Sequence, residues 1–173
     1  MTTSNSKAER IARASTKAGD YEEMSVNCAQ GTLAALQEEF GLEGGKELLK
    51  AATFFPGLMS RRETCGALLG GLMAMGLAHG RDKLFDPAWS TPEANAEMFR
   101  YRDKAYRYCE AFKAEFGSTM CGVIRPLMMG RDYDTMKPED RAQFLADGGK
   151  KKCRVPCETA ARIAAEILLE DEA

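Results

Sequence analysis

The chain has 173 residues, of which 45% are hydrophobic and 29% charged, and its formal net charge at pH 7 is -2. This length suits one domain that folds without disulfides, and the slight acidity argues against nucleic acid as the main partner. No apolar core of the signal-peptide type and no run of ~18 apolar residues is present, so we expect a cytoplasmic protein without a membrane partner.

Along the chain, apolar residues recur at helical spacing between residues that typically start or stop a helix. No period-two alternation typical of strands appears. Helices are expected over residues 7–18, 28–40, 46–55, 65–79, 92–116 and 121–128, then from Pro138 and from Pro156. A turn-rich connector, residues 86–92, holds Trp89. Residues 1–19 have few large apolar side chains and are expected as a loose helical extension before the main domain, residues 20–173. The pattern predicts an all-α, single-domain bundle of about six to eight helices.

The helix expected over residues 65–79 is apolar almost all round. It contains four glycines: Gly66, Gly70, Gly71 and Gly76. Each glycine costs a helix up to about 1 kcal/mol, so four of them indicate that other helices approach closely. We therefore expect this glycine-rich helix at the centre of the bundle.

Four of the six cysteines stand where a helix is expected to begin. They are Cys28, Cys65, Cys121 and Cys157. Helix N-termini expose unpaired N–H groups and a partial positive charge, so they lower the pKa of a thiol and favour anionic sulfur. Four such sulfurs could ligate a tetrahedral zinc ion or an iron–sulfur cluster, although a single cysteine of this kind is as often a small buried apolar group.

The spacing of the cysteines excludes several common sites. The chain has no C-x-x-C, so it lacks the local ligand pairs of structural zinc sites and of common ferredoxins. A covalent haem would need C-x-x-C-H, so none is expected. Cys109 lies at helical spacing from Phe112 and Phe116 and is expected to be a core residue.

Four segments nevertheless resemble a known family. They are NCAQGTLAAL, CGALLGGLMAMGL, FGSTMCGVI and CETAARIAAEIL. Together they resemble the C_GCAxxG_C_C family of redox-active proteins, from about residue 21 to residue 169. The most specific element is the run from Cys65 to Gly70, which matches the family's CGAxxG.

This resemblance implies a small helical domain in which four cysteines hold an iron–sulfur cluster. The residues that match the family's cysteines are Cys28, Cys65, Cys121 and Cys157. Cys153, one helical turn before Cys157, could take the last place. The split-Soret cytochromes carry a similar domain with a [2Fe-2S] cluster, so this cluster type is expected.

The chain departs from the family before Cys65, where a glycine-rich stretch is usual and residues 54–62 are bulky and end in Arg61 and Arg62. These cations could raise a cluster's potential or bind an anion. The leading hypothesis is an electron-transfer or redox-sensing protein with a redox partner protein, and a homodimer is possible. The run Lys150, Lys151 and Lys152 could dock an acidic partner.

Two other classes of function stay open. The first is an enzyme. Either Cys153 and Cys157 cycle between dithiol and disulfide, with Cys157 as the low-pKa attacker, or a cluster acts on a small anionic substrate held by Arg61 and Arg62. The second is a protein that binds Cu(I) or zinc, to which the ten methionines could contribute. Iron and sulfide content distinguishes these classes from the leading hypothesis.

Overall fold

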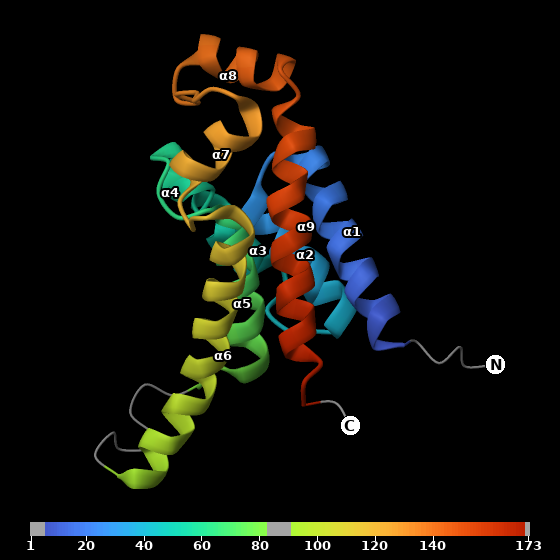
Figure 1. Cartoon of the computed structure of the whole chain (residues 1–173). Coiled ribbons are helices and arrows are strands. Elements are labelled where there is room, and N and C mark those ends of the chain that lie inside the picture. The colour runs from blue at the N-terminus through green and yellow to red at the C-terminus, as the bar shows by residue number, and fades with distance from the viewer. Residues whose placement is uncertain (1–5, 83–90, 172–173) are drawn as a thin grey trace, which may run out of the picture.

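The computed structural model describes residues 6–82 and 91–171, so Trp89 and most of the predicted connector lie outside the described residues. These residues form helices and no strand, which confirms the predicted all-α single-domain bundle (Figure 1). The elements are α1 (Lys7–Ser25), α2 (Cys28–Phe40), α3 (Gly45–Ala51), η1 (Ala52–Phe54), α4 (Gly57–Ser60), α5 (Gly66–His79), α6 (Pro92–Phe116), α7 (Cys121–Met129), α8 (Pro138–Ala146) and α9 (Gly149–Leu168).

Helix α1 packs closely instead of loosely, and it continues past residue 19 to Ser25. It runs beside α9 and α2 along most of its length (Figure 1). Ala14 and Ala18 are fully buried, and a side chain at Gly19 would overlap that of Arg154 on α9. Small residues one turn apart thus let the helix backbones approach, which supplies the burial that large apolar side chains would otherwise provide.

The glycine-rich helix α5 packs against α2, α9 and α6, as predicted for a central helix. Close neighbours require glycine at several positions of this helix, and two of them lie in its interior. A Cβ at Gly70 would overlap the carbonyl oxygen of Ala29 on α2, and a Cβ at Gly71 would overlap the hydroxyl of the fully buried Tyr108 on α6. The cost of glycine in the helix is therefore offset by the packing of two neighbouring helices.

The last helix begins earlier than predicted. α9 starts at Gly149, after Gly148 in the left-handed conformation (φ 80°), so Pro156 lies inside the helix rather than at its start. A proline there removes one backbone hydrogen bond and costs about 3 kcal/mol. α9 contacts α1, α2, α5 and α6 and buries ten of its residues, and this burial outweighs the local cost. Cys157 is thus an interior helical residue, one turn after Cys153.

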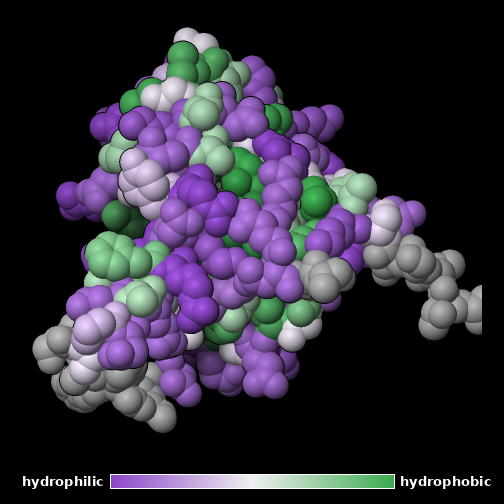
Figure 2. All heavy atoms as spheres, turned by 60° about the horizontal axis from the view of Figure 1, so that its bottom comes forward, coloured by the Kyte–Doolittle hydropathy of each residue, from purple (hydrophilic) through white to green (hydrophobic). Residues whose placement is uncertain are grey.

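The surface of the bundle is mostly polar on the face that Figure 2 shows. Hydrophilic residues cover most of this face, and hydrophobic residues are visible between them in small groups (Figure 2). Within the part of the chain that the structure describes, every helix is too short or too polar to cross a membrane.

We predict that Gly70→Ala lowers the free energy of unfolding by about 1–3 kcal/mol, because the new methyl group would meet the backbone of α2. Gly76→Ala on the same helix is the matched control. Nothing lies within 4 Å of a Cβ at that position, so we expect a gain of up to about 1 kcal/mol. Urea denaturation measures both variants, and equal stabilities would contradict the close approach of α2 and α5.

Candidate cysteine site

The starts of α5 and α7 are joined by an isolated antiparallel bridge between Thr64 and Met120. Three backbone hydrogen bonds flank it: Cys65 N–H to the Thr119 carbonyl (2.9 Å), Cys121 N–H to the Glu63 carbonyl (2.7 Å) and Gly122 N–H to the Arg62 carbonyl (2.8 Å). These bonds hold the first residues of the two helices side by side. Cys65 and Cys121, far apart in the sequence, are thereby brought to one place.

The segment before the bridge adopts an unusual backbone. Leu58, Met59, Ser60 and Arg62 all have positive φ, between 45° and 64°, which is costly for residues with a side chain. The conformation is held by hydrogen bonds from Ser60 N–H to the Pro56 carbonyl and from Glu63 N–H to the Gly57 carbonyl. The resulting tight turn wraps Cys121, whose Sγ would lie 3.4 Å from a Cβ at Gly57.

Five of the six cysteines lie in or next to one pocket of about 90 Å³ at this turn. Cys28, Cys121 and Cys153 line the pocket. Cys65 shares a hydrogen bond with the Cys28 thiol, and the Cys157 thiol faces the Cys28 carbonyl oxygen at 3.9 Å. The thiols come from α2, α7 and α9 and from the residue that caps α5, and all of them are free.

The sixth cysteine stands apart. Cys109 lies on α6, does not line the pocket and packs against the hydrophobic core. Phe112 and Phe116 on the same helix form a ring pair 4.8 Å apart, and Phe112 is fully buried in that core. Cys109 is thus half-buried at the edge of the core, and its predicted packing role is supported.

Cys65 is the thiol that a helix start activates. It caps α5, and its pKa is lowered first by the hydrogen bond from Cys28 and then by the backbone amides of Ala67 and Leu68 in the first turn. Only 5% of Cys65 is exposed. The site therefore contains one thiol whose pKa lies below its ordinary value and which is shielded from solvent.

The prediction that all four helix-start thiols have a lowered pKa is wrong for the other three. The pKa of Cys28 is raised by its hydrogen bond to Cys65 and by burial, and burial raises that of Cys121 to about 11. The first amides of α7 bond to the carbonyls of residues 62 and 63, so they are not available to the Cys121 sulfur. Cys157 lies inside α9, and burial raises its pKa, which also excludes it as a low-pKa attacker.

Glu22, on α1, also belongs to this pocket and was not predicted. It is 3% exposed, its Oε2 has no hydrogen-bond partner, and it lines the pocket with Cys28. Burial, and then the neighbouring Cys65, raises the pKa of Glu22 to about 8. The spacing of the sequence could have predicted this burial. Ala14, Ala18 and Glu22 follow one another at intervals of four, so they lie on the same face of the helix.

The cations of the pocket differ in part from those predicted. Arg62 lines the pocket, whereas Arg61 does not, since it points to solvent and pairs with Glu63 at 2.6 Å. A second arginine that lines the pocket, Arg125 on α7, was missed, and it is only 7% exposed. Arg62 and Arg125 both pair with Asp132. Residue type alone does not reveal that an arginine in a short helix is buried.

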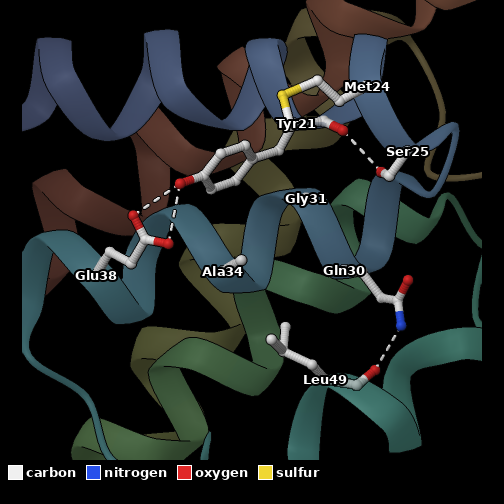
Figure 3. Close-up of a pocket in the computed structure, with 8 residues that line it drawn as sticks. All are labelled: Tyr21, Met24, Ser25, Gln30, Gly31, Ala34, Glu38 and Leu49. Atoms are coloured by element: carbon white, nitrogen blue, oxygen red, sulfur yellow. Dashed lines mark hydrogen bonds between the residues drawn. The ribbon is translucent and has the colours of Figure 1, made fainter. Parts of the chain in front are cut away.

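A larger cavity, of about 310 Å³, lies between α1 and α2 and contains no cysteine. Its polar groups are already bonded to the protein (Figure 3): the Tyr21 hydroxyl donates to Glu38, and the Gln30 amide donates to the Leu49 carbonyl. Gly31 brings α2 close to the backbone of α1 there. The groups left to bind a ligand in this cavity are few, so the cysteine pocket is the stronger candidate.

The thiols of the pocket match soft metals and iron–sulfur clusters in their chemistry. As the described residues stand, no group of three or more His, Cys, Asp or Glu side chains is arranged to hold a metal ion. The sulfurs would have to move closer together to coordinate one. The structure thus places five thiols in or next to one pocket without a formed coordination shell.

One protein-family model matches most of the chain. The model described as "Putative redox-active protein (C_GCAxxG_C_C)" matches residues 26–167. The chain belongs to the C_GCAxxG_C_C family. No curated protein and no solved structure matches the chain. In this member of the family both glycines of CGAxxG have a packing role: a Cβ at Gly66 would lie 2.5 Å from the Cys28 Sγ, and Gly70 admits the backbone of Ala29.

We predict that the unfolding free energy of the metal-free protein falls as the pH rises from 5 to 8. The unfolded carboxyl of Glu22 ionises near pH 4.5 and the folded one only near 8, so the unfolded state loses its proton first and gains stability. The loss is on the order of 4 kcal/mol at most. Chemical denaturation at several pH values should show that Glu22→Gln loses this fall in stability, whereas the exposed Glu47→Gln should keep the wild-type slope.

Proposed function

We propose that this C_GCAxxG_C_C protein is an iron–sulfur protein that transfers or senses single electrons, with the cluster held by Cys28, Cys65, Cys121 and Cys157. A [2Fe-2S] cluster would supply a one-electron carrier. The observation that supports this most is that four separate segments of the chain bring five free cysteines to one pocket.

The buried thiols would give up their protons to a bound metal. Burial raises the pKa of Cys28, Cys121, Cys153 and Cys157, so these thiols are neutral near pH 7. A metal that binds thiolates displaces these protons and compensates the buried negative charge. Cys65, with its lowered pKa, is the sulfur most ready to bind first.

The surroundings would tune the potential of a cluster at this place. Arg125 favours the thiolate form of Cys121 and Cys153, so its guanidinium acts on both sulfurs. A buried positive charge stabilises the more negatively charged reduced state and raises the potential. Of the two arginines predicted for this role, Arg62 keeps it, and Arg125 takes the place of Arg61.

A redox partner protein would exchange electrons at the open side of the pocket. Lys151 and Lys152 are exposed in the first turn of α9, directly before Cys153. Positive side chains at the rim of a contact speed the association with an acidic surface. We infer that the partner carries such a surface next to its own redox centre.

A second candidate function is dithiol chemistry at Cys28 and Cys65. Their thiols share a hydrogen bond, and the Cys65 pKa is lowered, as expected for an attacking thiol. Oxidation would join the two sulfurs and release two electrons and two protons to an acceptor protein. The burial of Cys65 limits access by such an acceptor, which makes this the weaker candidate.

Protein purified without oxygen should contain iron and acid-labile sulfide in equal amounts. We expect Cys65→Ser to lower the iron content several-fold, because it removes the thiol with the lowest pKa in the site. Cys109→Ser is the matched control and should leave iron and visible spectra unchanged, since Cys109 lies outside the pocket. If Cys65→Ser retained full iron and sulfide, the ligand set would be wrong.

The fourth ligand is assigned by comparing two variants of α9. We expect Cys157→Ser to lose the cluster, whereas Cys153→Ser keeps iron and sulfide near the wild-type level. The measurement is the same metal and sulfide analysis, with circular dichroism to verify folding. The opposite pattern would make Cys153 the ligand and leave Cys157 as a buried neighbour.

A further inference from the structure

We propose that the pocket also binds a small oxyanion, a carboxylate or an inorganic oxyanion, at a subsite formed by Arg125, Arg62 and Arg141 beside the cysteines. All three arginines line the pocket, and they come from α7, the turn after α4 and α8. This subsite does not depend on the nature of the metal, because it is built from residues other than the proposed ligands.

The central group is the guanidinium of Arg125. Its Nη2 donates to the Asp132 carboxylate at 2.9 Å and to the Tyr133 carbonyl, and its Cζ lies 5.8 Å from the Phe144 ring centroid. Its Nε, in contrast, is buried and has no hydrogen-bond partner. A buried donor without a partner is costly, so a group that accepts its hydrogen bond would stabilise the folded protein.

The other two arginines differ in how they are paired. Arg62 shares Asp132 with Arg125, so one carboxylate balances two guanidiniums. Arg141 is exposed, and no ion pair with it occurs among the described residues. Glu22 is the one carboxyl among the described residues that line the pocket, against three guanidinium groups. The pocket thus keeps an excess of positive charge that an anion would neutralise.

Size and polar lining restrict the class of ligand. The volume of about 90 Å³ equals roughly three water molecules, which suits an inorganic oxyanion or a carboxylate of one or two carbons. Ser60 and Thr135 line the same pocket and add hydroxyl groups that can donate to oxygen. Planar guanidinium groups bind two oxygens of such an anion at once.

The subsite lies beside two of the cysteines. Arg125 acts electrostatically on Cys121 and Cys153, which both line the pocket. An anion held by Arg125 would therefore lie next to these sulfurs. It could control access to the site, or be the group that the site acts on.

The test is isothermal titration of the full-length protein with sodium sulfate and with sodium acetate, at constant ionic strength set by sodium chloride. We expect saturable one-to-one binding of at least one anion, and the tighter one identifies the class. Arg141→Gln should weaken binding about tenfold, the value expected for losing one charged donor. Arg125→Gln should abolish it. Arg131→Gln is the matched control, because Arg131 is exposed nearby but does not line the pocket.

Arg141 makes the test independent of folding, since its exposed side chain can be changed without loss of a buried contact. The proposal is overturned if neither anion gives saturable binding, or if Arg141→Gln binds as tightly as Arg131→Gln. An equal loss in all three variants would also overturn it, because that result indicates diffuse surface charge. Iron and sulfide analysis of the same samples tests the cluster separately, so either proposal can fail alone.

Discussion

The bridge between Thr64 and Met120 is the constraint on which the site depends. Its flanking hydrogen bonds fix the start of α5 against the start of α7, and the same bonds occupy the first amides of α7. The pKa values of the two thiols at these helix starts are therefore shifted in opposite directions. Cys65 has free amides beside it and a lowered pKa, whereas Cys121 has none and its pKa is raised. A helix start thus lowers the pKa of a cysteine only when its first backbone amides can donate hydrogen bonds to the sulfur.

Close packing explains why the site tolerates so many buried polar groups. Gly66 and Gly70 let α2 lie against α5, which places the Cys28 sulfur next to Cys65. α1 and α9 then cover the site and bring Glu22, Cys153 and Cys157 to it. Buried thiols, a buried carboxyl and a buried guanidinium are expensive in a protein without ligands. Their gathering in one small pocket is typical of a binding site rather than of a core.

Much of the fold could be predicted from local signals, and most of the site's surroundings could not. The helices over residues 92–116 and 121–129 begin and end at the proline, cysteine and glycine signals that the sequence displays. The start of α9 was missed because a proline usually opens a helix, and only tertiary burial keeps Pro156 inside one. Glu22 and Arg125 were missed because their burial depends on helices distant in the sequence.

The four cysteines could be named from a motif, but their pKa values required the contacts that the fold creates. The most direct test of the cysteine site is the iron K-edge X-ray absorption spectrum of protein purified without oxygen. A cluster held by Cys28, Cys65, Cys121 and Cys157 predicts a first shell that contains only sulfur, with a second iron as the next neighbour. A shell of nitrogen or oxygen, or protein without iron, would contradict it.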